Sequence, residues 1–341
     1  MRNLMSIDSI LNIEPFSLTK NEKKKFFQDI IISLTDYHYT NSIHYKKIID
    51  GDEKKISYYK NIRDIPFLPV RLFKMYDLKS IKDEEVFKIL KSSGTTGQSV
   101  SKIFLDKETS LNQTKVLTKI FSTFIGKNRV PMIVIDSESV LKDRKLFSAR
   151  GAGILGFSIF AKKRIFALDK NMNIKTNEIL EFVKQHKNEK IFVFGFTFMI
   201  WQHFYKEIVS KKIKLNLSNS VLVHGGGWKK LINEKISNET FKNKLNKILG
   251  INKVHDYYGM VEQTGSIFME CEKGFLHTSI FSDILTRRPL DFEVADFGEK
   301  GIIQVFSILP KSYPGHSLLT EDEGIIYGED DCKCGRKGKY F

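Results

Sequence analysis

One stretch of this 341-residue chain combines backbone flexibility with many hydroxyl groups, KSSGTTGQSVSK at residues 91–102. The apolar run VFKIL (86–90) precedes it, and a second run, SKIFLD (101–106), begins with its last two residues and continues beyond it. Both runs are typical of strands, so the pattern predicts a hairpin whose loop offers hydroxyls and glycine-freed backbone N–H groups to phosphate oxygens. The loop is not a Walker A motif, which requires G-x-x-x-x-G-K-[ST] and a following helix. Taken alone, an ordinary Ser/Gly-rich surface hairpin explains it equally well.

Two further segments place chemistry at predicted strand ends. HGGGWKK (224–230) follows the apolar run SVLVHG, and HDYYGMVEQTG (255–265) places aromatic residues, a glycine and a carboxylate after another apolar stretch. Ligands of α/β sheets bind at the carboxyl ends of strands, where these segments would lie with the hydroxyl-rich loop. Glycines there let a flat base approach the backbone, Tyr258 is suited to stack on it, and Glu262 is suited to hold Mg²⁺ against phosphates.

A fourth segment, SYPGHSLLTEDEG (312–324), supplies Asp322, which can accept hydrogen bonds from ribose hydroxyls. In contrast, GAGILG (151–156) matches G-x-G-x-x-G by letter but lacks the context of a dinucleotide site. A charged stretch precedes it and a strand-like stretch follows it. We therefore expect its glycines to permit close packing or to line an apolar pocket.

The elements that must position these residues change type along the chain. Residues 1–85 read as an N-terminal helical cap, and residues 86–260 alternate short apolar strands with amphipathic helical stretches. Residues 261–341 are punctuated by glycine and read as a smaller β-rich subdomain. Strands alternating with helices predict an α/β fold whose sheets are covered by helices.

Composition narrows the classes of function. The chain has 55 Lys and Arg against 40 Asp and Glu, a formal net charge of +15. The basic residues are scattered and mixed with acidic ones, and no nucleic-acid-binding motif accompanies them, so we expect no nucleic-acid partner. No window approaches the roughly 20 apolar residues of a membrane span, and the N-terminus lacks a secretory pattern. The sequence therefore predicts a cytoplasmic protein.

Together, SSGTTG, HGGGWKK, YGMVEQ and SYPGHSLLTEDEG give the chain a family resemblance. It resembles the adenylate-forming enzymes, which include the acyl and aryl ligases related to phenylacetate-CoA ligase, and most closely the LuxE-type acyl-protein synthetases. SSGTTG is similar to their phosphate loop, and YGMVEQ to their Y-G-x-x-E adenine and magnesium motif. HGGGWKK and SYPGHSLLTEDEG are similar to segments peculiar to the LuxE-type branch. The resemblance extends from SIDSILNIEPFSL to the last residue.

The resemblance implies that ATP and a carboxylic acid, expected to be a fatty acid, form an acyl-adenylate and pyrophosphate. The acyl group would then pass to a protein thiol, with an acyl reductase or another acyl-acceptor protein as partner. Hydroxyls, backbone N–H groups and Mg²⁺ suit this chemistry, because the protein must hold two anions in line. The residues expected to bind ATP are Ser92, Ser93, Gly94, Thr95, Thr96 and Gly97 at the phosphates, Gly225, Gly226, Tyr258, Gly259 and Met260 at adenine, Glu262 at Mg²⁺ and Asp322 at ribose. Thr96 and Glu262 are the predicted catalytic residues.

Two other functions stay open on the sequence. An acyl- or aryl-CoA ligase would use the same ATP motifs and pass the adenylate to a small thiol, whereas a non-catalytic subunit would only bind nucleotide or acyl groups. On the resemblance, a segment with the acceptor cysteine and a C-terminal lid with a catalytic lysine are expected beyond CGRKGKYF, and neither is among the 341 residues. We therefore expect either a truncated form or an acceptor located elsewhere.

The cysteines form the last group of candidates. Cys271 lies six residues before His277, and Cys332 and Cys334 form a C-x-C motif near the end of the chain. Three thiolates and one imidazole make a complete tetrahedral zinc shell, which predicts a structural zinc ion. Some aryl-CoA ligases similar to this chain carry a comparable cluster. Two alternatives remain, buried thiols without a metal and a reactive acyl-accepting cysteine.

Overall fold

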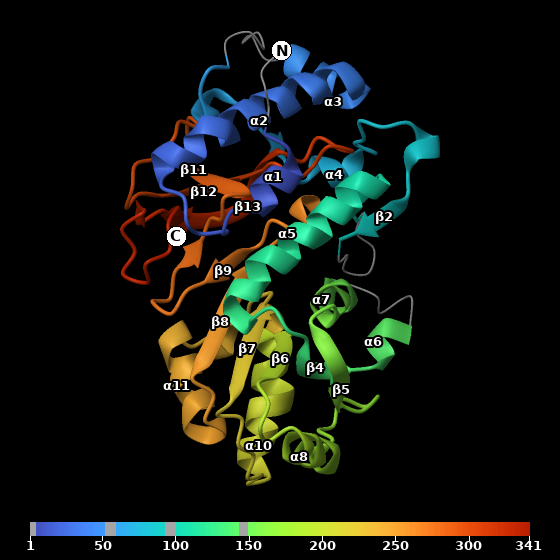
Figure 1. The fold of residues 1–341 in the computed structure, drawn as a ribbon, viewed down its shortest axis with the longest axis vertical. Coiled ribbons are helices and arrows are strands. Elements are labelled where there is room, and N and C mark those ends of the chain that lie inside the picture. Colours follow the sequence, from blue (N-terminus) through green and yellow to red (C-terminus); the bar gives the residue numbers. More distant parts are fainter. Residues whose placement is uncertain (1–4, 52–58, 93–99, 143–148) are drawn as a thin grey trace. The chain divides into compact units, whose positions relative to one another are not determined.

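The computed structural model describes residues 5–51, 59–92, 100–142 and 149–341, which fold into two compact units (Figure 1). The first unit comprises residues 1–121, 259–268 and 275–341, and the second comprises residues 122–258 and 269–274. Helices and sheets occur in both units, so the predicted α/β class is confirmed. The first unit joins segments from both ends of the chain. The division into residues 1–85, 86–260 and 261–341 therefore stays a prediction about domains rather than a description of these units.

The second unit is built on parallel strands in the order β5-β4-β6-β7-β8. Their bounds are β4 Val130–Ser137, β5 Ala161–Leu168, β6 Ile191–Phe196, β7 Ser220–Gly225 and β8 Lys253–Tyr258. Every residue of β6 and β7 is buried. Strands that are covered on both faces have nearly continuous apolar sequences, because neither face contacts water. This explains the composition of IFVFGF in β6 and SVLVHG in β7.

Helices connect the parallel strands of the second unit (Figure 1). They are α6 Ser139–Lys142, α7 Ala149–Ser158, α8 Thr176–Gln185, α9 Thr197–Met199, α10 Lys206–Ser210 and α11 Asn238–Leu249, and a π-helical turn spans Ile200–Tyr205. Local sequence sets the ends of α11. The Ser237 side chain accepts a hydrogen bond from the Thr240 N–H at its start, and Gly250 ends it with φ of 73°.

The first unit contains a four-stranded sheet in the order β1-β13-β12-β11. Its strands are β1 Leu68–Pro69, β11 Ser282–Arg287, β12 Lys300–Ser307 and β13 Ser317–Ile325. Strand β12 pairs antiparallel with both β11 and β13, whereas β1 is parallel to β13. The short strands β10 Leu276–His277, β14 Gly328–Glu329 and β15 Lys339–Tyr340 pair antiparallel through β15. Strand β9, Phe268–Glu270, straddles the residue boundary between the two units.

Helices of the first unit come mainly from the N-terminal part of the chain (Figure 1). They are α1 Ile7–Leu11, α2 Lys20–Asn41, α3 Ile43–Asp50, α4 Leu72–Met75 and most of α5 Lys107–Ile125. At the start of α2 the Glu22 carboxylate accepts hydrogen bonds from the backbone N–H and the hydroxyl of Thr19. The buried side chains of α2 include Phe26, Phe27, Ile30, Ile31 and Leu34, which recur every three or four residues, as one helix face requires.

Two predicted motifs lie in clear structural contexts. VFKIL and SKIFLD contain the antiparallel strands β2, Lys88–Lys91, and β3, Lys102–Leu105, so the predicted hairpin is confirmed by its stem. All of GAGILG lies inside α7 rather than in a turn that opens a helix. This placement is not that of a dinucleotide fingerprint. Among the described residues, no helix is both long and apolar enough to span a membrane.

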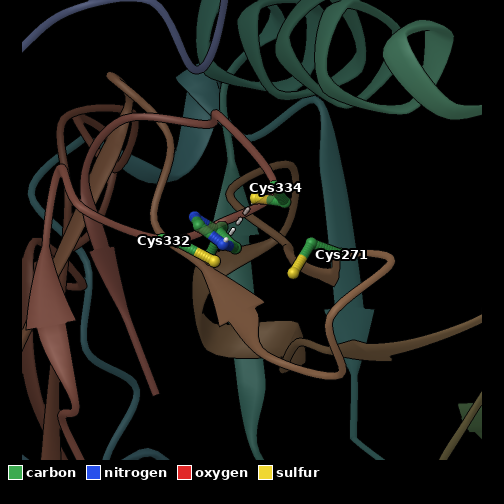
Figure 2. Close-up of side chains that lie close together, drawn as sticks. Cys271, Cys332 and Cys334 are labelled. Atoms are coloured by element: carbon green, nitrogen blue, oxygen red, sulfur yellow. Dashed lines mark hydrogen bonds between the residues drawn. The ribbon is translucent and has the colours of Figure 1, made fainter.

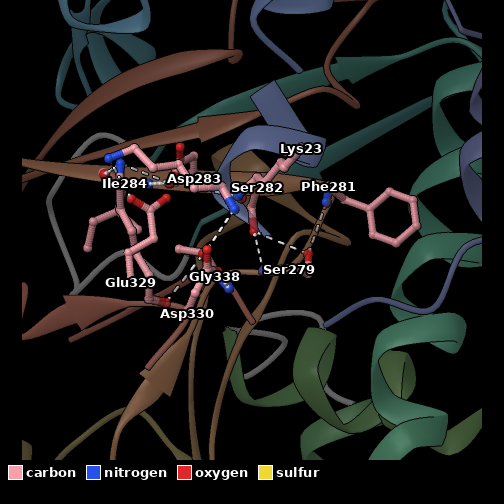
Figure 3. Close-up of polar contacts among 12 residues, drawn as sticks. Lys23, Ser279, Phe281, Ser282, Asp283, Ile284, Glu329, Asp330 and Gly338 are labelled. Carbon is pink, nitrogen blue, oxygen red and sulfur yellow. Dashed lines mark hydrogen bonds and ion pairs between the residues drawn. The ribbon is translucent and has the colours of Figure 1, made fainter. Parts of the chain in front are cut away.

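A buried ionic cluster joins α2, β11 and β15 inside the first unit (Figure 3). The Asp283 carboxylate lies 3.1 Å from the Lys339 ammonium and 3.8 Å from that of Lys23. Lys23 also donates to the Ser282 carbonyl at 2.6 Å, and Lys339 donates to the Ile284 carbonyl at 2.8 Å. Burial alone would raise the pKa of Asp283, but the two ammonium groups outweigh it and lower that pKa. The cluster therefore depends on one ionised carboxylate.

A buried histidine pair lies elsewhere in the first unit, with ring centroids 4.9 Å apart. His38 is hydrogen-bonded through Nε2 to the Pro310 carbonyl and through Nδ1 to the Ser80 hydroxyl, at 3.0 and 2.7 Å. His316 Nε2 lies 3.0 Å from the Thr35 hydroxyl. Burial lowers the pKa of His38 to about 3 and that of His316 well below its usual range, so both rings are neutral in the folded protein at neutral pH.

We predict that Asp283→Asn lowers the free energy of unfolding by about 3–5 kcal/mol, because it removes the carboxylate that pairs with both buried ammonium groups. Urea denaturation measures the loss. Asp296→Asn is the matched control, since the Asp296 side chain is 89% exposed and its loss should stay within about 0.5 kcal/mol. Equal stability of the two variants would show that the cluster does not hold these elements together.

We also predict that the histidine pair makes the protein sensitive to acid. Each ring binds a proton below pH 6.5 in the unfolded chain but not in the folded one, so its contribution to stability is complete above that pH and is lost as the pH falls. Each ring should add about 1.4 kcal/mol per pH unit to the slope. Between pH 6 and 4, His316→Gln should lower the slope of the unfolding free energy against pH by about 1.4 kcal/mol per pH unit. The exposed His44→Gln should leave this slope unchanged. An unaltered slope in His316→Gln would contradict the assignment.

Candidate active site

The hydroxyl-rich loop begins and ends on a hydrogen-bonded stem in the first unit. Ser92 donates its backbone N–H to the Ser101 carbonyl at 3.1 Å, and the Ser101 N–H donates to the Ser92 side-chain oxygen at 2.8 Å. Of the residues expected at the phosphates, Ser92 is thus the one placed. The others, Ser93, Gly94, Thr95, Thr96 and Gly97, lie outside the described residues. The stem confirms where the loop starts and closes, and their roles stay predictions.

Glu262 occupies a short 3₁₀ turn, Val261–Gln263, that neighbouring side chains hold in place. The Gln263 amide donates to the Val305 and Gly315 carbonyls at 3.2 and 2.9 Å. The Tyr313 hydroxyl donates to the Glu262 carbonyl at 2.9 Å. All of these groups belong to the first unit. The turn is therefore fixed by strand β12 and by the SYPGHS segment.

Close packing reinforces this arrangement. Gly315 lies so near the turn that an added Cβ would stand 2.3 Å from the Tyr313 ring and 2.8 Å from the Glu262 carbonyl oxygen. The fully buried Tyr313 hydroxyl also accepts a hydrogen bond from the Gln113 amide at 3.2 Å. Only glycine fits at position 315, so SYPGHS has the composition needed to support Glu262.

The Glu262 side chain is 6% exposed, and its burial raises the pKa of the carboxyl group. The Ser101 hydroxyl and, more weakly, the Lys74 ammonium act in the opposite direction. Ser101 is itself buried, and its hydroxyl makes no hydrogen bond of normal geometry with any described residue. A buried carboxylate beside an unsatisfied hydroxyl is a site where a cation would stabilise the ionised form.

In the second unit, the glycine motif follows β7 next to the end of β8. Gly225 pairs with Tyr257 across the two strands, and a Cβ on Gly225 would lie 2.6 Å from the Tyr257 ring. Gly226 and Gly227 continue with φ of 75° and 64°, and both are exposed. Of the two glycines predicted at adenine, Gly226 therefore presents exposed backbone after the carboxyl end of β7, whereas Gly225 is buried against Tyr257. Their role toward adenine stays a prediction.

Two titratable residues lie beside these glycines. His224 Nδ1 is 2.9 Å from the Thr197 hydroxyl and 3.6 Å from the Asp256 carboxylate. Burial lowers the pKa of His224 to about 4. Burial and then the Glu270 carboxylate raise the pKa of Asp256, although its side chain is 43% exposed, which lets water moderate the shift. Glu270 accepts a hydrogen bond from the Asp256 N–H at 2.7 Å and pairs with Lys242 at 2.7 Å.

The other residues that were predicted to bind the nucleotide belong to both units. Tyr258 ends β8 in the second unit, and Gly259 and Met260 follow it in the first. Asp322 lies in β13 of the first unit with an exposed side chain. Its backbone N–H donates to the Thr320 hydroxyl at 3.2 Å. The structure thus gives the local setting of each residue, and their roles toward adenine and ribose stay predictions.

Two apolar segments, GAGILGF (151–157) and FGFTFMIW (194–201), pack together in the second unit. The Phe157 ring of α7 lies 4.7 Å from that of Phe194 in β6 and 5.1 Å from that of Tyr257 in β8, centroid to centroid. Helix α7 is also tied to the end of β4, because the Arg150 guanidinium donates twice to the Asp136 carboxylate, at 2.9 and 2.8 Å. GAGILGF and FGFTFMIW therefore contribute to one aromatic layer.

The four predicted metal ligands lie together (Figure 2). The ligand atoms of Cys271, His277, Cys332 and Cys334 are all within 4.8 Å of one another. Cys271 lies in the turn between β9 and β10, His277 in β10, and the C-x-C motif between β14 and β15. His277 Nε2 is 3.4 Å from the Cys334 sulfur. A shared metal ion would require this proximity, and the ion itself stays a prediction.

Several residues of the site were not found by sequence reasoning. Tyr313, Gln113 and Ser101 support Glu262 from other parts of the chain, and Asp256 lies beside the glycines that were predicted to bind the base. Tyr313 and Asp256 lie inside two of the quoted motifs, SYPGHS and HDYYG. Their positions in these motifs could therefore have marked them as residues of the site. Gln113 lies in an ordinary amphipathic helix, and nothing in its neighbourhood distinguishes it.

Comparisons with known proteins agree with this architecture. Residues 2–341 match the family described as "Acyl-protein synthetase, LuxE". A structure of 2-hydroxyisobutyryl-CoA ligase in the postadenylation state is similar with a TM-score of 0.71 and 13% identity, over 96% of this chain and 67% of that one. An open conformation of this ligase is similar with a TM-score of 0.71 and 14% identity, over 96% of this chain and 74% of that one. At such identities the likeness establishes the fold.

The search of curated proteins finds no match. The family match covers almost the whole chain and agrees with the motifs from which the resemblance was first drawn. The chain therefore belongs to the LuxE family of acyl-protein synthetases and is an adenylate-forming ligase.

Proposed function

We propose that this protein activates a carboxylic acid, most simply a fatty acid, with ATP and transfers the acyl group from the adenylate to a protein thiol. Family membership supports the reaction type. The observation that carries the proposal is the buried Glu262 carboxylate, held in its turn by Tyr313 and Gln263. A structural role alone would not need an ionisable group at this position, because burial penalises its charge.

The residues around Glu262 fit a magnesium ion. Mg²⁺ prefers carboxylate oxygens and usually keeps several waters and phosphate oxygens in its shell. Glu262 would supply the protein carboxylate, and the Ser101 hydroxyl can accept from or donate to a bound water. When bound, the ion would neutralise phosphate charge. The chain's own part is to hold the carboxylate still and exclude bulk water.

The chemistry of each predicted residue indicates which part of ATP it would contact. Ser92, Ser93, Thr95 and Thr96, with Gly94 and Gly97, would donate hydroxyl and backbone N–H groups to the phosphates. Gly225, Gly226, Tyr258, Gly259 and Met260 would contact adenine, and Asp322 would accept from the ribose hydroxyls. Support comes from the exposed backbone of Gly226 and the exposed carboxylate of Asp322.

The reaction has two displacements. A carboxylate oxygen of the acid attacks the α-phosphorus, the bond to the bridging oxygen of the β-phosphate breaks, and pyrophosphate leaves with the electron pair. A thiolate then attacks the acyl carbon, and AMP leaves as the carbon–oxygen bond breaks. No side chain need act as nucleophile in the first step, so the protein's contribution is positioning and charge stabilisation.

The acyl chain is proposed to lie along the aromatic layer of Phe157, Phe194 and Tyr257. Such a surface recognises an aliphatic chain by removing it from water, which yields about 0.8 kcal/mol per buried methylene. The acceptor would be an acyl reductase or another acyl-acceptor protein. Because the reaction consumes ATP, we place the enzyme in the cytoplasm.

An ATP–pyrophosphate exchange screen over fatty, aromatic and hydroxy acids tests the proposed reaction. We expect exchange that depends on a fatty acid and on Mg²⁺. No exchange with any acid would overturn the proposal in favour of a non-catalytic binding subunit. Thioester formation with added coenzyme A, at a rate matching turnover with a protein acceptor, would instead identify an acyl-CoA ligase.

We predict that Glu262→Gln abolishes pyrophosphate exchange while the protein stays folded. The substitution preserves the side-chain volume but removes the charge that would hold Mg²⁺. Exchange kinetics and circular dichroism are measured together, with the exposed Glu108→Gln as a control expected to retain activity. Wild-type exchange by a folded Glu262→Gln protein would refute the assigned role.

Thr96→Val tests the hydroxyl-rich loop, because it removes one donor at nearly constant size. We expect exchange to slow, or the KM for ATP to rise, by roughly tenfold or more. Thr114→Val, on the exposed face of α5, is the control and should leave both constants unchanged. Wild-type constants in Thr96→Val would leave SSGTTG as an ordinary hairpin loop.

A further inference from the structure

We propose that Cys271, His277, Cys332 and Cys334 bind one zinc ion in a closed structural site, and that these cysteines are therefore not the acyl acceptor. The metal site does not depend on the proposed adenylation reaction, whereas its consequence for the acyl acceptor rests on the proposed function. It arises from four side chains that come from two loops and one strand, and Figure 2 labels the three cysteines among them. Three sulfurs and one imidazole nitrogen supply a complete set of ligands for tetrahedral zinc.

The separations suit one small ion. In a tetrahedral site with metal–sulfur bonds of 2.3 Å, ligand atoms stand about 3.7 Å apart. The four ligand atoms here lie within 4.8 Å of one another, and the Cys334 sulfur is 3.4 Å from His277 Nε2. Small side-chain rotations would bring all four to bonding distance. Random cysteine and histidine neighbours would not converge on one point in this way.

The two cysteine loops have the same local geometry. In CEKG, the Gly274 N–H donates to the Cys271 carbonyl at 3.0 Å, and in CKCG the Gly335 N–H donates to the Cys332 carbonyl at 3.0 Å. Both glycines have φ of 85°, a conformation that side-chain-bearing residues rarely adopt. Two distant segments thus form the same tight turn around their sulfurs.

Each turn also directs a backbone donor at sulfur. The Lys273 N–H donates to the Cys271 sulfur at 3.4 Å, and the Arg336 N–H donates to the Cys334 sulfur at 3.4 Å. Hydrogen bonds to the charged form favour a thiolate over a thiol. Since zinc binds thiolate, the backbone is arranged for the form of cysteine that a metal requires.

Burial and charge fit a structural ion. Cys271 and His277 are fully buried, and Cys332 is 7% exposed. Zinc with three thiolates and a neutral imidazole has a net charge of −1, and the C-terminal run CKCGRKGK is strongly basic. The His277 ring is also held, because it stacks on Tyr340 with centroids 5.7 Å apart. Soft sulfur ligands favour zinc over magnesium or calcium.

Zinc binding has a consequence for the acyl acceptor. The sequence contains three cysteines, and all three are in this cluster. On binding, each thiol loses its proton to solvent and its sulfur forms a bond to zinc, which withdraws charge from the sulfur and makes it a weaker nucleophile than a free thiolate. The site has four protein ligands and no open position. The thiol that receives the acyl group must then lie outside these 341 residues.

The test begins with the wild-type chain purified after growth in zinc-supplemented medium. Elemental analysis should find about one zinc per chain, retained through dialysis, and a strong chelator should lower the Tm. Cobalt substitution should produce a thiolate-to-cobalt charge-transfer band. Less than about 0.1 zinc per chain after reconstitution with zinc chloride would overturn the proposal.

Variants separate ligands from merely buried side chains. Cys334→Ser, at the half-exposed position, and His277→Gln should each reduce retained zinc by roughly tenfold or more, whereas His44→Gln should retain it. Incubation of the zinc-loaded protein with ATP and acid should give no hydroxylamine-sensitive thioester on any cysteine. A thioester on Cys332 or Cys334 would overturn the proposal, and its absence while pyrophosphate exchange continues would support it. The zinc content tests the metal site separately, whether or not the chain catalyses exchange.

Discussion

The burial of one carboxylate, that of Glu262, is the constraint around which the first unit is organised. An ionised group taken out of water costs several kcal/mol unless neighbouring groups compensate. Here the compensation is geometric as well as electrostatic. Gln263 and Tyr313 fix the backbone of the turn, and Gly315 is small enough to let the Tyr313 ring approach. The carboxylate is thereby held where a cation, rather than a protein charge, would complete its environment.

In the second unit, the feature that matters for the proposed site is exposed backbone at the ends of parallel strands. The buried strands β6 and β7 make a rigid base, and the chain after β7 leaves it through glycines. Gly225 is needed because the Tyr257 ring occupies the space of a side chain. The same packing brings α7 against β6 and β8, so aromatic side chains and bare backbone are presented by one set of elements.

The C-terminal segment of the first unit is fastened by two kinds of interaction. Lys339 reaches the buried Asp283 carboxylate, and Asp330 accepts a hydrogen bond from the backbone N–H of Lys20 at the start of α2. The proposed zinc site would add a third attachment through Cys332 and Cys334. Each attachment joins residues far apart in the sequence, which limits local opening of the chain end.

The sequence by itself determined the fold class, the hairpin around SSGTTG, the parallel strands and the family, because these depend on local periodicity and short motifs. It also selected Glu262 and the four cysteine and histidine ligands by residue type and spacing. Only the tertiary structure decided that Tyr313, Gln113 and Ser101 surround Glu262, and that GAGILG lies within a helix. The physical reason is that these contacts join residues far apart in the sequence, 51 positions for Tyr313 with Glu262 and 200 for Gln113 with Tyr313, or depend on packing that no local pattern encodes.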